Sequence, residues 1–568
     1  YHDNKDLDFT LSGGFAFDGG RGHVVMSGEV FSNSGANGTI DMTGGVARRP
    51  YARQGYALIP GGPGQPLQVA VPNVKFANMT FGGLITSGPL KGIYFGPNGA
   101  LETMTYGTHL TVPTGTYMQG GTGDATQLMG SISPQLGRES LYTHVSYDFT
   151  PDFTAWAQLL IVHETAFSPN VPNYDNNTLT IKSDNPFIPA AAKTLMTANN
   201  LTQFTFGRVD PELGLGQSKE YTYDVLWDVG FNGKIFGNWA WDLTAQYNSN
   251  QWNFKYLHER NNALWALGID VTSNPTVAAG GVAGVAVGAP ICRSTLANPS
   301  NGCVPINLFG INSITPAMVA YAGGYSLNTA PQQAWDVSAN LNGILLQDWA
   351  GDVSVAAGFE ARRDSVHMYA DAVSIAKSWR AYNLPPFTGN FQVEEGYLEA
   401  DVPLLKDVPF AQNLGLNAAG RLTNYSNFGT VETWKIGLDN QVNDDLRMRA
   451  TYSSDIRAPT LNDLFAAGGV NQGQFFDNFA KQSVTLRTTT GGNPKLLPEQ
   501  GNTFTGGLVY SPGWLAGFTG SLDYFSIHLH NGIQTTTAQQ ALDACQLYNI
   551  ASACSLITRD ASGKVTDV

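Results

Sequence analysis

The first residues that could do chemistry are carboxylates and histidines at close spacing. Glu394, Glu395 and Glu399 lie in one extended stretch, and His528 and His530 lie two residues apart. Paired carboxylates can act as general acid and base, and histidines on one strand face can bind a metal. Two ligands are too few for a metal site, however, and no HExxH, GxSxG or P-loop motif occurs. We therefore expect no enzyme, metal site or cofactor, and interpret the glutamates as structural polar groups of an extended segment.

Aromatic side chains of the long connections are candidates for ligand binding, because they can stack on the rings of a small ligand such as a sugar. The alternative is packing of one loop on another. Arg457, just before Ala458-Pro459, is a weaker candidate, since it can instead form an ion pair with Asp463 or Glu499. The aromatic candidates are Trp252, Phe254, Tyr256, Tyr325, Trp379, Phe475, Phe476 and Phe479.

The four cysteines fall into two close pairs, Cys292 with Cys303 and Cys545 with Cys554. Neither pair is a CxxC motif, and no histidine stands beside them at ligand spacing. Local pairing would close two short loops, a pattern typical of an oxidising compartment. We predict two disulfides, each within an external loop.

Composition excludes several classes of protein. Of 568 residues, only 13% are charged, whereas 64 are glycine and 11% are aromatic. The net charge of -14 argues against a nucleic-acid partner. Mean hydropathy is -0.13, and no run of about 18 uncharged apolar residues could form a membrane helix. Low charge with average hydropathy is typical of a membrane β-barrel, in which apolar and polar residues alternate.

Alternation with a period of two is clearest at 221–231 and 239–247. One face of the first segment carries Tyr221, Tyr223, Val225 and further apolar residues, and the other carries mostly polar residues. The second segment, which contains Leu243 on its apolar face, repeats this pattern after a short turn. A helix would mix the two sets, so we predict a hairpin with one apolar side. The same pattern recurs at 335–342 and 446–453.

Short and long connections alternate along the chain. The seven short turns predict about fourteen antiparallel strands. Long external loops and short periplasmic turns are typical of outer-membrane barrels. The short turns are 18–22, 150–152, 232–238, 347–351, 406–413, 442–445 and 511–517, and the long connections are about 34–138, 169–218, 253–332, 370–388 and 458–501.

Aromatic residues near the short turns predict an interfacial girdle, with Trp156, Trp239, Trp241, Trp349 and Trp514 among them. The alternative is a soluble all-β repeat or sandwich protein. Strands of ten or more residues with an apolar aromatic face suit tilted membrane strands better. We therefore predict an all-β antiparallel transmembrane barrel with a polar lumen.

Two segments with a fixed order and spacing carry a family resemblance. They are SDIRAPTLNDLF at 454–465 and GNPKLLPEQ at 492–500, which a strand to Tyr510 follows. Together they resemble the TonB-dependent outer-membrane receptor family. SLDYFSIHL at 521–529 is similar to the family's next strand. DNPFIP at 184–189 and CVPINLFG at 303–310 resemble loop segments of one branch.

The resemblance implies a 22-stranded barrel whose lumen is filled by an N-terminal plug. We therefore expect residues 1–568 to form a partial transmembrane β-barrel domain of about fourteen strands, with the plug and C-terminal strands outside this sequence. Open sheet edges would leave N–H and C=O groups unpaired in lipid, so we expect further strands in the native molecule.

The implied function is active import of a scarce solute, either siderophore-iron or an oligosaccharide or peptide, across the outer membrane of a Gram-negative bacterium. The implied partners are outer-membrane lipid, the small solute, and a TonB-type energy-coupling protein that acts through the plug; no nucleic acid is expected. A passive outer-membrane porin and an adhesin-like surface barrel are the alternatives.

Overall fold

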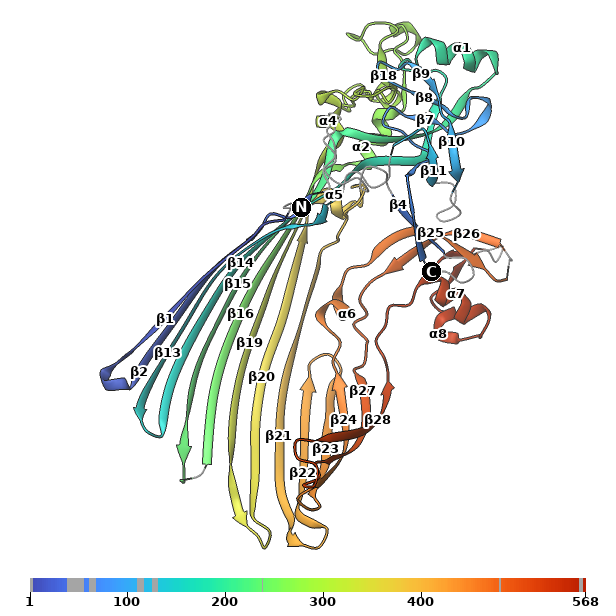
Figure 1. The fold of residues 1–568 in the computed structure, drawn as a ribbon. Coiled ribbons are helices and arrows are strands. Elements are labelled where there is room, and N and C mark those ends of the chain that lie inside the picture. Colours follow the sequence, from blue (N-terminus) through green and yellow to red (C-terminus); the bar gives the residue numbers. More distant parts are fainter. Residues whose placement is uncertain are drawn as a thin grey trace.

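One large sheet dominates the computed structural model of the chain, which describes residues 4–37, 56–60, 68–109, 117–124, 131–237, 239–479, 482–560 and 565–568. The sheet has 17 strands, of which three are short and fourteen follow one another in chain order (Figure 1). The long strands are β1 (Asp6–Phe17), β2 (Gly22–Asn33), β13 (Gln135–Thr150), β14 (Phe153–Lys182), β15 (Gln203–Ile235), β16 (Trp239–Arg260), β19 (Gly323–Gln347), β20 (Asp352–Ala370), β21 (Phe387–Val408), β22 (Ala411–Tyr425), β23 (Gly429–Gln441), β24 (Leu446–Arg457), β27 (Glu499–Tyr510) and β28 (Gly520–His530).

Each long strand pairs antiparallel with the next one along the chain. All seven predicted hairpins form, and their turns lie at one end of the sheet (Figure 1). The β23–β24 turn occupies the predicted 442–445, whereas β15 continues to Ile235 and shortens the predicted 232–238 turn. The prediction of an antiparallel membrane sheet with about fourteen strands is confirmed.

The two faces of the sheet differ in polarity as the alternation predicted. On β15, Tyr223, Trp227 and Phe231 are exposed, whereas Asp228 between them is buried. Asp228 accepts a hydrogen bond from Gln158 on β14. The buried, hydrogen-bonded polar groups make this the lumenal face, and the exposed apolar face is the one that meets lipid.

Aromatic rings gather at the end of the sheet that carries the short turns. Phe149 and Phe153 lie 5.4 Å apart between ring centroids, and Phe153 lies 6.1 Å from Trp241. Trp349 and Trp514 are also exposed near these turns. Rings with one apolar and one wet side suit the boundary between lipid and water.

At the opposite end, β14, β15 and β16 run far beyond the predicted strand ends and into a folded outer cap. Here the predicted connections at 169–218 and 253–332 are too long, because β14–β15 pairing continues past Pro169 and Pro172 through bulges and β16–β19 pairing continues to Arg260 and Gly323. The cap also contains β7 (Leu84–Ile85), which pairs with β15 at Gly207. A Cβ on Gly207 would lie 1.9 Å from the Asn78 carbonyl oxygen, so the close approach requires glycine. Further cap elements are β6 (Val74–Phe76), β8 (Ile93–Phe95), β9 (Leu101–Thr103), β10 (Tyr106–His109), β11 (Tyr117–Gly121), α1 (Ala190–Ala198), α2 (Asn262–Ile269), β17 (Val271–Ser273), β18 (Pro290–Cys292), α3 (Arg293–Ala297) and α4 (Pro316–Ala322).

The cap has a hydrophobic core of its own. Phe206 of β15 packs on Phe95 and Phe309 at centroid distances of 6.0 and 5.6 Å, and all three rings are buried. Met196 of α1 and Trp265 of α2 belong to the same cluster. Three stretches that are far apart in sequence therefore form one unit outside the membrane sheet.

The remaining loops carry short elements and the second disulfide. Both predicted disulfides, Cys292–Cys303 and Cys545–Cys554, are present and thus confirmed. No helix in the described ranges is long and apolar enough to cross a membrane. The short elements are α5 (Ala372–Ile375), α6 (Leu461–Phe465), β25 (Gly469–Asp477), β26 (Gln482–Thr490), α7 (Ala538–Gln546), α8 (Ala551–Cys554), β29 (Thr558–Arg559), β30 (Val565–Asp567), β3 (Ala36–Asn37), β4 (Tyr56–Pro60), β5 (Gln68–Pro72) and β12 (Ser131–Ser133).

The assignment of faces predicts opposite outcomes for two neighbouring residues of β16. Replacing Leu243 by Arg should lower the free energy of unfolding by roughly 2–4 kcal/mol if it lies near the bilayer midplane, because the charge would enter hydrocarbon. Thr244→Arg, on the lumenal face, should cost much less. Urea titration in lipid vesicles measures both; equal losses would contradict the assignment.

Candidate functional site

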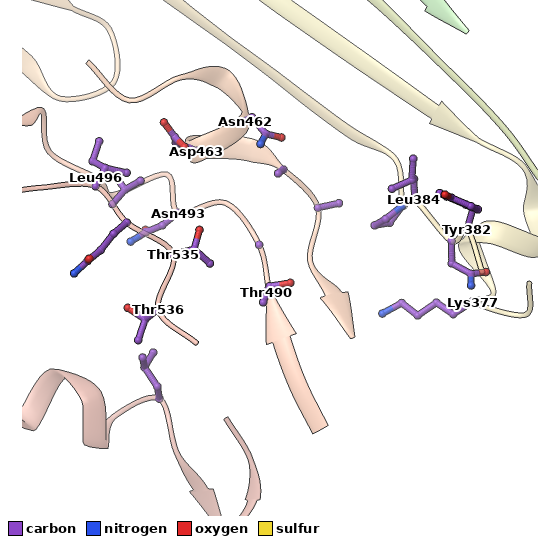
Figure 2. A pocket seen from close by; sticks show the side chains of 18 of the residues that line it. Lys377, Tyr382, Leu384, Asn462, Asp463, Thr490, Asn493, Leu496, Thr535 and Thr536 are labelled. Carbon is purple, nitrogen blue, oxygen red and sulfur yellow. The ribbon is translucent and has the colours of Figure 1, made fainter. Parts of the chain in front are cut away.

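A large cavity lies at the outer end of the sheet, where segments of the β20–β21 connection, the β24–β27 connection and the chain after β28 meet. Its volume is about 940 Å³, near the upper end of the roughly 300–1,000 Å³ of small-molecule sites. Lys377, Tyr382 and Leu384 face the other labelled side chains across it (Figure 2). The residues that line it are Lys377, Ala381, Tyr382, Asn383, Leu384, Pro385, Arg457, Asn462, Asp463, Ala466, Ala467, Thr490, Gly491, Asn493, Leu496, Ile533, Gln534, Thr535, Thr536 and Leu556.

An ion pair at the end of β24 joins the β24–β27 connection to the chain after β28. Arg457 lies opposite Glu499 in the β24–β27 register, and its Nε and Nη2 lie 2.7 and 3.0 Å from the two carboxylate oxygens. Its Nη1 lies 3.7 Å from Asp463. The Ile533 N–H also donates to Glu499, over 2.6 Å. Glu499 therefore ties β24 and β27 to the segment after β28.

Helix α6 positions Asn462 and Asp463 at the cavity. Thr460 caps its first turn by accepting a hydrogen bond from the Asp463 N–H, and Asp463 accepts one from the Thr460 N–H. Reciprocal capping of this kind satisfies N–H groups that a short helix leaves unpaired. The preceding Pro459 restricts the chain as it leaves β24.

Loop 371–386, between β20 and β21, forms the facing wall. Asp371 accepts hydrogen bonds from the Ser374 hydroxyl, the Leu327 N–H and the Trp379 indole. Although desolvation opposes them, these bonds hold the pKa of Asp371 below its usual range. Trp379 packs so closely on Gly324 that a Cβ there would lie 2.5 Å from the ring. The base of the loop is thereby fixed to β19.

The outer end of β16 holds the middle of the same loop. The Ala381 N–H donates to Glu259 over 2.8 Å, and the Arg380 N–H donates to the Arg260 carbonyl over 2.9 Å. Burial raises the pKa of the Glu259 carboxyl, although the Ala381 N–H opposes this rise. The wall that carries Tyr382 is therefore attached to the cap as well as to the sheet.

A second cavity of about 330 Å³ lies beside Ala381 and Tyr382, which line both cavities. Its walls include Tyr174, Tyr256 and Arg380. The Arg380 guanidinium lies 3.9 Å from the Tyr174 ring centroid, and the Tyr256 and Tyr382 rings lie 4.4 Å apart. Aromatic rings with a stacked guanidinium form a partly apolar site with one positive group.

A buried cluster of charges joins the strand extensions to the cap. Arg208 is fully buried and donates to Asp210 and Glu212, both over 2.6 Å. It also donates to the Leu308 and Gly310 carbonyls, which belong to the β16–β19 connection. In the same cluster, Arg260 of β16 pairs with Asp175 and Asp210. Because each charge has an opposite partner, the cluster can hold the cap in one position.

None of the aromatic candidates is among the described residues that line the large cavity. The expectation that Phe254 and Tyr256 belong to a long connection is wrong, since both are buried side chains of β16; Trp379 lies in loop 371–386 as expected but is buried. The cause is packing on other rings, such as Tyr382, which lies 5.2 Å from Phe254. Tyr256 lines the second cavity.

The other aromatic candidates also occupy separate places. Trp252 belongs to β16 and donates to Glu220 over 3.3 Å. Tyr325 of β19 is exposed, with the Lys255 ammonium 3.8 Å from its ring. Phe475 packs on the Leu542 cluster, Phe479 is exposed, and the side chain of Phe476 lies outside the described part of the structure. Their ligand-binding role stays a prediction.

Arg457 lines the cavity, but it forms ion pairs with Asp463 and Glu499, which the sequence analysis gave as the alternative to ligand binding. Sequence reasoning missed Tyr382, Thr535 and Thr536. A usable signal was present for Asn462, Asp463, Asn493 and Leu496, since these lining residues lie in the motifs at 454–465 and 492–500.

The glutamates and histidines provide no catalytic or metal arrangement. Glu395 pairs with Arg421, and Glu399 accepts a hydrogen bond from Asn417 over 3.0 Å, so both serve the lumenal face. Within the described ranges, no three His, Cys, Asp or Glu side chains are placed to hold a metal ion.

A family model described as "TonB dependent receptor-like, beta-barrel" matches residues 191–564. No curated protein matches the chain. Solved structures that are similar include a mutant ferric enterobactin receptor, PfeA, from Pseudomonas aeruginosa, with 12% identity, coverage of 93% of this chain and 50% of that chain, and a TM-score of 0.42. The siderophore receptor PirA from Acinetobacter baumannii has 10% identity, coverage of 92% and 49%, and a TM-score of 0.41. The chain thus spans about half the length of these receptors.

The buried charge cluster predicts how strongly the cap depends on Arg208. Arg208→Met should destabilise the cap by about 3–5 kcal/mol, because Glu212 would lose its buried partner and Asp210 would keep only Arg260. Arg293→Met, which removes more exposed ion pairs to Asp184 and Asp270, should cost at most about 1 kcal/mol. Limited proteolysis of the purified protein across a urea series measures both. Equal sensitivity of the two variants would show that the cluster does not hold the cap.

Proposed function

The chain belongs to the TonB-dependent receptor-like β-barrel family, and we propose that it is part of an outer-membrane receptor that actively imports a scarce solute. Members of this family are receptors and transporters of the Gram-negative outer membrane, not enzymes. The proposed solute is a siderophore-iron complex or an oligosaccharide or peptide. The energy comes from an inner-membrane TonB-type complex, and the coupling acts through a plug segment.

The observation that carries the proposal is the 940 Å³ cavity at the loop end of the membrane sheet. A receptor that captures a dilute solute needs a preformed site with polar groups that converge on it. Ion pairs and hydrogen bonds hold the cavity walls in place, so little ordering is left for the moment of binding. An adhesin needs no such cavity, and a passive porin needs no tight site.

The proposal also includes strands beyond those described here. β1 and β28 are the two ends of the row of paired long strands, and both expose large apolar side chains, such as Phe9 and Leu522. Lipid offers their backbone groups no hydrogen-bond partner. Additional strands, from this polypeptide or from a partner, therefore complete a barrel of the 22-stranded type, and residues 1–568 form one partial barrel domain of it.

Active import predicts that uptake stops when the energy source is removed. The solute is first identified as the compound that cells with the receptor gene remove from the medium and cells without it leave. Adding a protonophore, or deleting the TonB-type partner, should abolish uptake while leaving binding to the surface. A passive porin would continue to equilibrate the solute, and that result would contradict the proposal.

The cavity predicts which residues matter for this uptake. Tyr382→Ala should weaken binding of the solute about tenfold or more, because large aromatic contacts contribute most to binding energy. Tyr548→Ala, an exposed tyrosine outside both cavity linings, is the matched control. Binding to the purified receptor is measured by calorimetry, and an equal effect of the two variants would remove the cavity as the site.

A further inference from the structure

The charged groups of the 940 Å³ cavity largely neutralise one another. The charged lining residues are Lys377, Arg457 and Asp463. Arg457 is engaged by Glu499 and Asp463, so its guanidinium is not available to an incoming anion. With Glu499 included, two cations face two carboxylates. Among the described residues, a chelate that carries several negative charges would lose its hydration here and find only the Lys377 ammonium as an unpaired cation in exchange.

Uncharged polar side chains dominate the rest of the lining. Among the described residues, Thr490, Gln534, Thr535 and Thr536 have no hydrogen bond from their side chains to another protein group, and neither has the Asn462 amide. Asn493 uses its Oδ1 for the Lys495 N–H, and its Nδ2 remains open. Hydroxyls and amides both donate and accept. They match ligand groups that also do both, as sugar hydroxyls do.

Apolar side chains of the cavity match a second feature of sugars, the C–H faces of their rings. Leu384, Leu496, Ile533 and Leu556 line the cavity, and Tyr382 adds a ring that two other aromatics hold in place. Sugar rings have apolar C–H faces between their hydroxyls, and such faces pack on aromatic and aliphatic groups. The volume, near the top of the small-molecule range, suits more than one ring.

We infer that the ligand of this cavity is an uncharged, hydroxyl-rich molecule, namely a neutral oligosaccharide. This inference rests on the proposed function, because it names the class of solute for the same site. It selects one of the classes that the sequence left open. Neutral hydrogen bonding together with contacts to ring faces, and not charge pairing, then provides the affinity.

The first test measures binding of a defined panel to the full receptor purified in detergent. The probes are neutral oligosaccharides of glucose, xylose, mannose and N-acetylglucosamine, a uronic-acid oligosaccharide, an uncharged tetrapeptide, and ferric catecholate and hydroxamate siderophores. At least one neutral oligosaccharide should bind most tightly, and its Kd should change less than about twofold between 50 and 500 mM NaCl. Preference for a siderophore, the uronate or the peptide overturns the inference, as does absence of binding by every neutral sugar.

The second test uses variants that keep side-chain shape and remove a hydroxyl. Thr535→Val and Thr536→Val should each weaken the Kd of the neutral oligosaccharide about three- to tenfold, the effect of one lost hydrogen bond. Thr194→Val, on the surface of α1 and outside both cavity linings, is the matched control for folding and detergent behaviour. An unchanged Kd in both cavity variants overturns the assignment of the site.

The two proposals fail in different ways. Tight binding of a neutral oligosaccharide without energy-dependent uptake would overturn active import and leave the ligand class intact. Energy-dependent uptake of a ferric siderophore would do the reverse.

Discussion

The structure depends on one constraint, that a strand in lipid must satisfy its backbone N–H and C=O groups by pairing with other strands. Fourteen strands that each pair with the next one along the chain meet this demand everywhere except at the outer edges of β1 and β28. The same pairing places alternate side chains on opposite faces. Lipid then accepts the apolar set, and hydrogen bonds such as that between Gln158 and Asp228 satisfy the polar set.

Strand pairing in the sheet stabilises the protein in the membrane. The loops at its outer end are not needed for this and can serve another function. They form a cap with a separate hydrophobic core, at the centre of which lie Phe206, Phe95 and Phe309. The charged cluster around Arg208 and Arg260 connects this core to the strand extensions. Buried ion pairs contribute little net stability but tolerate only one arrangement. The cap is therefore held at a defined position relative to the cavity.

The cavity combines rigidity with unpaired hydrogen-bonding groups. Arg457 and Glu499 form an ion pair that holds the cavity walls together. The surface left for a ligand therefore consists mostly of hydroxyls, amides and apolar groups. On the cap side, the Glu259 carboxylate accepts a hydrogen bond from the Ala381 N–H and so also holds a cavity wall in place. This division between groups that build the wall and groups that face the solute explains why the site lacks a strong charge.

Local pattern determined the membrane sheet. The apolar and polar alternation at Tyr223, Trp227 and Asp228, and the seven short turns, follow from residues next to one another in sequence, because strand periodicity and turn chemistry act over a few residues. Close cysteine spacing likewise predicted both disulfides. Only the tertiary structure decided that β14, β15 and β16 continue into the cap and that Phe254, Tyr256 and Trp379 are buried, since their partners lie far away in sequence. The cavity, too, arises only when three distant parts of the chain meet, and Tyr382 and Thr535 belong to no pattern until the fold brings them together.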